Sequence, residues 1–344
     1  MIAPADRDVM LPPPRTRVRV AAAIVIGVLC LVVGEVGARI VHVTPQSRNA
    51  QAASNSWTQS DPMLGWRARG GGVYRANNGT ETTILPDGSR TVGPGPSAGP
   101  SVLLVGCSFT FGVGLRDDET LGWKLQQRFP DVRFRNFGAS GYGTYQSLLL
   151  LRDLVETKHE HPALVIYGFV PFHADRNVLT ATTMEGFRFT RGGLFSPPRV
   201  AVRDGRLLTF PPYVVKPWPL EDRSGLVSLL HKVEVHVRFA GRERGREQAT
   251  TLLLSEMKAL TDRIGARLLV ATLWDGDSRW RSSYQTMRAG MRAAGIEELD
   301  VTYRGPETRP EKLEVVGDGH PSGLVDTWWA DTLEPWIRRQ DLRR

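Results

Sequence analysis

Cysteine is scarce in this chain of 344 residues, which contains only two. Cys30 lies inside an apolar run and Cys107 lies beside a candidate nucleophile, so a disulfide between them would join two chemically incompatible places. Neither cysteine therefore reports the redox compartment. The seven histidines show no ligand-pair spacing with acids, apart from His159 and His161 on an expected loop. This pattern argues against a metal-dependent hydrolase, and we expect neither a metal nor a cofactor.

The sequence also has no segment in which charges of one sign are concentrated. The 44 Lys and Arg residues exceed the 36 Asp and Glu residues, giving a net charge of +8, but the basic residues are scattered along the chain. This distribution argues against a nucleic-acid partner. The sequence has no internal repeat, and its hydrophobic content of 41% argues against a disordered or fibrous protein. The length fits one large domain with additions, or two small domains.

One apolar segment near the N-terminus is long enough to cross a bilayer. It has no charge from Val20 to Gly34 and stays largely apolar to about Val43, which gives roughly the twenty residues that a spanning helix needs. Arginine precedes the segment three times and follows it closely once, at Arg15, Arg17, Arg19 and Arg39. The positive-inside bias predicts that residues 1–19 are cytoplasmic, that residues 20–43 form a transmembrane helix, and that the rest is periplasmic or extracellular.

A cleaved signal peptide is the alternative for this segment. Ala50-Gln51-Ala52 resembles a cleavage site, but it lies too far beyond the apolar core for efficient cleavage. We therefore prefer an uncleaved membrane anchor.

The remainder of the chain divides by composition into two parts. Residues 44–100 read as a polar tether followed by a small β elaboration, with turn signals at Asn78-Gly79 and Asp87-Gly88. Residues 101–344 alternate apolar strands with helical patterns, which predicts an α/β fold with a parallel sheet covered by helices. Strands are expected at 101–105, 132–137, 164–169, 267–273 and 297–301. Helices are expected at 120–128, 145–156, 250–264, 279–294 and 325–339.

An insertion interrupts this alternation at about residues 171–247. It contains hairpin signals at Arg191-Gly192-Gly193 and Asp204-Gly205. A long insertion of this kind usually shapes a substrate cleft. Trp218, with Tyr213 and Phe210, could stack on sugar rings or simply pack on the domain.

Ser108 is the candidate nucleophile, because it follows the apolar run at 102–105 and would stand at the carboxyl end of the first sheet strand. Ligands bind at that edge of open α/β sheets. The segment lacks the glycine two residues after the serine that a nucleophile elbow requires, which argues against the α/β-hydrolase fold. The alternative role for such a serine is to cap the next helix.

Asp318 and His320 form the second candidate element, in the sequence Gly-Asp-Gly-His-Pro-Ser-Gly at 317–323. Glycines on both sides of Asp318 allow an unusual turn. A carboxylate two residues before a histidine can take the Nδ1 proton and leave Nε2 to accept a proton from serine. The alternative is a turn that carries a surface histidine.

The sequence Gly-Cys-Ser-Phe-Thr-Phe-Gly at 106–112, with Asp-x-His-Pro downstream, resembles the SGNH/GDSL hydrolase superfamily. The resemblance covers about 101–339 and implies a flavodoxin-like, three-layer α/β/α domain. It implies that Ser108, His320 and Asp318 are catalytic. It also implies that the backbone N–H groups of Ser108 and Gly141 form an oxyanion hole, with Gly138 as the second choice of glycine. The single residue between Asp318 and His320 departs from the commoner spacing of two, and resembles the branch that includes alginate acetylation proteins.

The third family block departs from the pattern, because the segment at 168–177 has no asparagine at the expected position. His173 occupies the nearest position and could donate an N–H to the oxyanion, or it could cap or pack. Asn177 lies four residues further on as a substitute. Arg176 could hold the insertion or bind an anionic substrate group.

These observations predict an acyl-serine enzyme. With water as acceptor it would be an esterase acting on O-acyl groups of envelope carbohydrate or a lipid-linked substrate. With a sugar hydroxyl as acceptor it would be an O-acyltransferase of a cell-surface polysaccharide. A catalytically decayed glycan-binding subunit is the non-enzymatic alternative. Expected partners are the acyl ester, the membrane and other envelope-glycan assembly proteins.

Overall fold

The computed structural model describes residues 14–41, 57–75, 79–96, 98–190, 196–212, 216, 218–274 and 276–342. The chain divides into two compact units. The smaller comprises Met1–Arg48 and Pro217–Glu234, and the larger comprises Asn49–Lys216 and Val235–Arg344. All the candidate catalytic residues belong to the larger unit.

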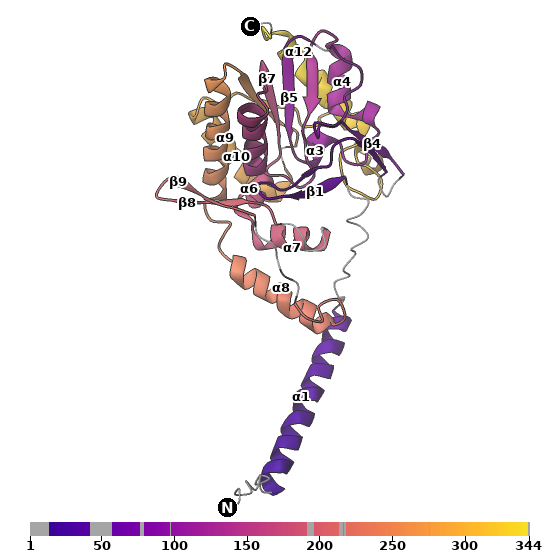
Figure 1. The fold of residues 1–344 in the computed structure, drawn as a ribbon, viewed down its shortest axis with the longest axis vertical. Helices are drawn as coiled ribbons and strands as arrows, with labels where there is room; N and C mark the ends of the chain where they lie inside the picture. The colour runs from indigo at the N-terminus through magenta and orange to yellow at the C-terminus, as the bar shows by residue number, and fades with distance from the viewer. Residues whose placement is uncertain are drawn as a thin grey trace, which may run out of the picture. The chain divides into compact units, whose positions relative to one another are not determined.

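A five-stranded parallel sheet forms the centre of the larger unit (Figure 1). Its strands are β5 (Ser101–Gly106), β6 (Arg133–Asn136), β7 (Leu164–Phe169), β10 (Arg267–Thr272) and β11 (Glu298–Asp300). The spatial order is β11-β10-β7-β5-β6. Numbered along the chain, this is the 2-1-3-4-5 order of flavodoxin-like sheets. Every residue of β5 and β7 is buried, which explains why these central strands read as continuous apolar runs.

Helices cover both faces of the sheet, so the predicted three-layer α/β/α architecture is confirmed (Figure 1). One face packs against α5 (Thr144–Arg152), α9 (Arg246–Arg263) and α10 (Ser278–Ala293). The other packs against α4 (Leu121–Arg128) and α12 (Gly323–Arg338). Alternate residues of each strand enter opposite cores: Leu103 and Val105 enter the first, and Val102 and Leu104 enter the second.

The five predicted strands and five predicted helices of the main domain are all present, with small differences at their ends. The helix expected at 145–156 ends as α-helix at Arg152 and continues as a π-helical turn, η2 (Asp153–Thr157). Helix α9 begins four residues before the expected start, because Gly245 adopts a left-handed conformation and Arg246 opens the helix after it.

Two hairpins lie where the sequence predicts a small β elaboration. Strands β1 (Thr58–Asp61) and β2 (Gly65–Ala68) pair, and β3 (Gly72–Arg75) pairs with β4 (Glu81–Ile84). Asn78 lies outside the described residues. The predicted turn at Asp87-Gly88 is present, with Gly88 in the left-handed region and its N–H donating to the Leu85 carbonyl.

The insertion after β7 contains more helix than its turn signals predict. Its elements are α6 (His173–Val178), α7 (Ala181–Thr190), β8 (Arg199–Arg203), β9 (Arg206–Phe210) and α8 (Gly225–Phe239). Asp204 and Gly205 both have positive φ and join β8 to β9, as a tight hairpin requires. The signal at 191–193 and Tyr213 lie outside the described residues, and Phe210 lies under the Arg199 guanidinium.

The N-terminal apolar segment is helical, as predicted. Helix α1 (Pro14–Ile40) includes the stretch Val18–Ile40, which is long and apolar enough to cross a membrane. No part of its most apolar stretch is buried by the chain itself. Residues 1–13 and 42–56, which hold much of the expected cytoplasmic segment and tether and the Ala50-Gln51-Ala52 site, lie outside the described residues.

A buried carboxyl joins the last helix of the domain, α12, to the start of helix α4. Oδ2 of Asp326 in α12 accepts the Leu121 N–H at the start of α4 at 2.7 Å. Asp326 is almost completely buried, and that burial raises its pKa to about 8. Near neutral pH the folded protein therefore holds a proton that the unfolded chain releases.

Stability is expected to fall as the pH rises from about 4 to about 8, because across that window the folded state binds more protons at Asp326 than the unfolded state does. Asp326→Asn keeps a carbonyl oxygen for the Leu121 N–H and cannot ionise. Denaturant unfolding at pH 5 and pH 8 should show that the variant loses less stability than the wild type, by about 3 kcal/mol. Asp331→Asn, at an exposed position on the same helix, is the control. Equal losses in the wild type and Asp326→Asn would contradict the assignment.

Candidate active site

Ser108 is the first residue of the short helix α3 (Ser108–Phe111), immediately after β5. The turn is tight: a Cβ on Gly106 would lie 2.8 Å from the Gly168 carbonyl oxygen and still closer to Thr110. Gly112 ends the helix in a left-handed conformation. The serine therefore stands at the carboxyl edge of the central strand, as its sequence position predicts.

Asp318 and His320 lie on a small loop that closes on itself. The Val315 N–H donates to the His320 carbonyl at 2.7 Å, and the Asp318 N–H donates to the Val315 carbonyl at 3.0 Å. Gly317 and Gly319 both adopt positive φ, which is the backbone freedom that their positions suggest. Within this loop Nδ1 of His320 lies 2.5 Å from Oδ1 of Asp318. The carboxylate thus fixes the ring so that Nε2 is left to accept a proton.

The fold brings this loop beside the turn that carries Ser108. The rings of Phe109 and His320 meet edge to face, with centroids 5.9 Å apart. A Cβ on Gly114 would lie 3.3 Å from Oδ2 of Asp318. Among the described residues, neither the Ser108 hydroxyl nor Nε2 of His320 forms a hydrogen bond. Phe109 and His320, some 210 positions apart in sequence, are thus in ring contact, and this contact places the loop of the histidine next to the turn of Ser108.

The glycine-containing loop after β6 packs directly on the nucleophile turn. A Cβ on Gly138 would lie 2.5 Å from the Phe111 backbone nitrogen, so only glycine fits there. The Asn136 side chain donates to the Thr110 carbonyl at 2.9 Å and accepts the Gly138 N–H. Gly141 has a φ of 85°. The structure therefore gives Gly138 a packing role and leaves Gly141 as the loop glycine with a special conformation.

His173 and Asn177 are both buried in a polar network beneath the site. Nδ1 of His173 lies 2.7 Å from the Tyr167 hydroxyl, and burial lowers the pKa of His173 well below its ordinary value. The Asn177 amide donates to the hydroxyls of Thr144 and Thr250 and accepts the Tyr145 N–H. The Asn177 side chain is thus fully engaged within the protein. The neutral, fully buried ring of His173 fits the alternative in which it packs.

Arg176 lies between the loop after β6 and the turn that carries Ser108. Its Nη1 donates to the Tyr142 carbonyl at 2.9 Å, next to Gly141, and its guanidinium interacts with the Cys107 side chain, next to Ser108. The guanidinium also lies over the Phe172 ring, 4.4 Å from its centroid. Burial lowers the pKa of Arg176, but a guanidinium is basic enough to stay charged near neutral pH. This is a fixed positive charge with remaining N–H donors at the edge of the site.

Arg90 is a positioning residue that the sequence does not reveal. It is fully buried, and its guanidinium donates to the carbonyls of Phe111, Gly112 and Leu115, which follow Ser108. Nε also donates to Asp117 at 3.0 Å, in the turn η1 (Asp117–Glu119). A lone arginine in the predicted β elaboration carries no signal for such a role. Only the folded chain shows that it holds the nucleophile turn.

Replacing Arg90 with methionine is expected to destabilise the protein by about 3–5 kcal/mol, because three buried carbonyls and one carboxylate lose their donor. Denaturant unfolding of the full chain in detergent measures this loss. Arg116→Met is the matched control, since the Arg116 ion pair with Asp118 is exposed and should contribute less than about 1 kcal/mol. Similar losses for the two variants would show that Arg90 does not hold the turn.

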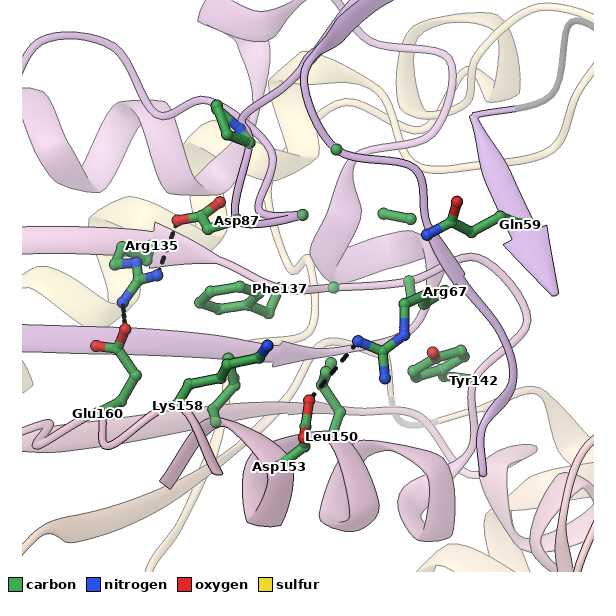
Figure 2. Close-up of a pocket in the computed structure, with 17 residues that line it drawn as sticks. Gln59, Arg67, Asp87, Arg135, Phe137, Tyr142, Leu150, Asp153, Lys158 and Glu160 are labelled. Atoms are coloured by element: carbon green, nitrogen blue, oxygen red, sulfur yellow. Dashed lines mark hydrogen bonds and ion pairs between the residues drawn. The ribbon is translucent and has the colours of Figure 1, made fainter. Parts of the chain in front are cut away.

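A separate polar pocket of about 420 Å³ is lined in part by the loop after β6 (Figure 2). Two arginines that line it form ion pairs. Arg135 pairs with Asp87 and Glu160, and Nη1 of Arg67 lies 3.7 Å from Oδ2 of Asp153. Ala139 and Tyr142 line it, but Ser108 and His320 do not. The pocket therefore shares a wall with the loop after β6 and is not the candidate active site.

The fold and site together define a doubly wound α/β protein with a serine, a histidine and an aspartate at the carboxyl edge of its sheet. No family model matches the chain, and no curated protein matches it.

Solved structures similar to the chain include an acetylxylan esterase mutant from Geobacillus stearothermophilus, with a TM-score of 0.41, 12% identity, and coverage of 73% of this chain and 99% of that one. A psychrotrophic esterase from Pseudoalteromonas sp. has a TM-score of 0.40 and 11% identity, covering 70% and 99%. A GDSL-like lipase from Bacteroides thetaiotaomicron has a TM-score of 0.37 and 14% identity, covering 70% and 88%. At these scores the likeness does not decide the function, which we argue from the site.

Proposed function

We propose that this chain is a membrane-anchored serine esterase of the SGNH/GDSL type, acting through an acyl-serine intermediate on O-acyl groups of envelope carbohydrate or a lipid-linked substrate. The observation that carries the proposal is the Asp318–His320 pair, 2.5 Å apart, on a loop beside the Ser108 turn. A base held by a carboxylate next to a serine is the arrangement that nucleophilic catalysis requires.

In this mechanism the Ser108 hydroxyl attacks the ester carbonyl while Nε2 of His320 accepts its proton. Asp318 stabilises the imidazolium through Nδ1. His320 then returns the proton to the departing alcohol, leaving an acyl group on Ser108. Water, activated by the same histidine, attacks this ester and releases the acid. The Ser108 hydroxyl is restored in the last step.

Negative charge develops on the carbonyl oxygen during both attacks, and it needs donors. The backbone N–H groups of Ser108 and Gly141 are two, and Arg176 supplies a third in place of the family asparagine. Its guanidinium is already held between Tyr142 and Cys107, the neighbours of those two residues. His173 supports this arrangement from below through Tyr167. Each such donor lowers the barrier by about 3–4 kcal/mol.

The α1 helix anchors the domain, with the N-terminal arginines in the cytoplasm and the catalytic domain outside. The stretch Val18–Ile40 supports the anchor by its length and apolar composition. The order of charge around it supports the orientation. An esterase in that place would meet acylated glycans and lipid-linked intermediates directly.

Covalent labelling tests the proposed chemistry. The full chain in detergent is incubated with a fluorophosphonate probe and digested, and the modified peptide is sequenced by mass spectrometry. The proposal expects one adduct, on Ser108, together with hydrolysis of a chromogenic phenyl acetate by the unlabelled protein. An adduct on a different serine would remove Ser108 from the mechanism, and no adduct with no hydrolysis would favour the glycan-binding alternative.

Arg176→Gln is expected to lower kcat for a neutral acetate ester by about 10²- to 10³-fold with little change in KM, because the lost donor acts in the transition state. Arg176→Lys keeps the charge but not the planar fork, and should recover only part of the rate. Steady-state kinetics measures both parameters. A change confined to KM would make Arg176 a substrate-binding residue, and unchanged kinetics with lowered stability would make it structural.

A further inference from the structure

The N-terminus of α8 is fastened to the C-terminal part of α1. Glu35 of α1 accepts hydrogen bonds from the Ser224 hydroxyl at 2.7 Å, the Gly225 N–H at 3.1 Å and the Leu226 N–H at 2.9 Å. A Cβ on Gly34 would lie 3.0 Å from the Leu226 side chain, so the two helices touch closely here. Both partners belong to the smaller unit. The carboxylate satisfies N–H groups that the start of α8 would otherwise leave unpaired.

This attachment sets the depth of α8 in a bilayer. Glu35 lies five residues before the end of α1 at Ile40, which is about 7.5 Å along the helix axis. The apolar stretch Val18–Ile40 is long enough to fill a hydrocarbon core of about 30 Å. The first turn of α8 therefore lies at the boundary between headgroups and acyl chains. Interfacial helices bury their apolar face about 5–10 Å at that boundary.

Helix α8 has a buried face and, opposite it, an exposed apolar stripe. Ser228, His231, Val235 and Phe239 recur every three or four residues and are each about 2% exposed. On the opposite side run Leu226, Leu230, Val233 and Val237, spaced four, three and four residues apart. Leu230 is 49% exposed, Val233 52% and Val237 73%. This spacing places the four on one stripe of the helix, which faces away from the covered side.

The segment before α8 extends the same exposed apolar surface. Leu220 is 59% exposed, and Trp218 is 37% exposed while stacking on the buried ring of His231 at 5.0 Å. Oε2 of Glu221 lies 2.9 Å from Nδ1 of that histidine and also accepts the backbone N–H of Trp218. The tryptophan is thus fixed in place with part of its ring outward. Tryptophan at this depth is typical of the membrane interface.

We propose that α8 is an interfacial helix whose apolar stripe, with Trp218 and Leu220, lies in the lipid surface of the bilayer that α1 crosses. The proposal commits to lipid as the partner because Glu35, within the apolar stretch of α1, holds the first turn of α8, where the exposed stripe begins. The inference rests on the proposed anchoring by α1, and not on the esterase chemistry. It makes the smaller unit a two-part membrane attachment, one part spanning and one part lying in the surface.

Site-directed probes on the full chain test this attachment. In a Cys30→Ala background, Cys107 is retained because it is buried, and single cysteines are introduced at Leu230 and Val233 for an environment-sensitive nitrobenzoxadiazole label. Val73→Cys is the matched control, an apolar residue of strand β3 that is 62% exposed. The labelled proteins are reconstituted in phosphatidylcholine vesicles with and without lipids spin-labelled near the headgroup end of the acyl chain.

Probes at Leu230 and Val233 should emit at shorter wavelength and be quenched about threefold more strongly than the probe at Val73. Alkaline extraction of the same vesicles tests the anchoring by α1 separately from the position of α8 in the lipid surface. If the chain stays in the membrane and all three probes are quenched equally weakly, the anchor holds and the interfacial helix is refuted. If the chain is extracted, both are refuted. A disulfide between copies of Leu230→Cys, with no quenching, would identify the stripe as a dimer contact and overturn the lipid assignment.

Discussion

Ser108→Ala is expected to lower kcat for acetate-ester hydrolysis by about 10⁵- to 10⁶-fold, leaving only what binding and the oxyanion donors contribute. The Ser108 hydroxyl is the group that attacks the substrate in the proposed mechanism, and a hydrogen replaces it with little steric change in a residue only 3% exposed. The measurement is steady-state hydrolysis of a chromogenic phenyl acetate, with burst amplitude as an independent count of acylated sites.

The control for this variant is Ser282→Ala, an exposed serine on α10. It should keep full activity and the full burst. Thermal unfolding of both variants should match the wild type, because neither change removes a packing contact of any size. Substantial activity in Ser108→Ala would place the chemistry elsewhere and remove the serine from the mechanism.

Asp318→Asn is expected to lower turnover by about 10⁴-fold while leaving the fold intact. The amide can turn its N–H₂ group toward Nδ1 and so favour the wrong tautomer, and it lacks the negative charge that stabilises the imidazolium. The loop should persist, because its turn depends on backbone hydrogen bonds between Val315, Asp318 and His320 and on two glycines. Steady-state kinetics and circular dichroism measure the two effects separately.

Asp118→Asn provides the comparison, since that carboxylate sits in an exposed ion pair with Arg116. It should change neither rate nor stability by more than a small factor. Near-normal turnover in Asp318→Asn would show that the 2.5 Å contact with His320 is structural only.

The sheet and its covering helices could be predicted because their signal is local. Strands β5 and β7 are buried on every residue, so their apolar runs stand out without any tertiary information. The contact between Asp318 and Nδ1 of His320 can be predicted from the sequence in the same way. Two residues on one small loop, with glycines at 317 and 319, can adopt few relative orientations. Alternation of strands and helices then places Ser108 at the sheet edge.

Residues that act over long sequence distances could not be found in this way. Arg90 precedes the sheet and contacts the turn after Ser108, and no pattern in its own neighbourhood marks that contact. The sequence offers His173 and Asn177 in place of the missing asparagine and gives Arg176 another role, and only the packed network shows Arg176 held beside the Ser108 turn. The role of Glu35 depends on a helix that begins 190 residues later.

The base and its orienting carboxylate share one loop between Glu314 and Pro321, which pair as an isolated bridge across its neck. A shift of this loop would move the Asp318 carboxylate and the His320 ring together, so their hydrogen bond would not change. Such a shift would change only their distance from the Ser108 hydroxyl. In the proposed mechanism, the position of this loop therefore sets the turnover rate through one distance, from the Ser108 hydroxyl to Nε2 of His320. A ligand or lipid that moved the loop would change that rate without changing the tautomer of the histidine.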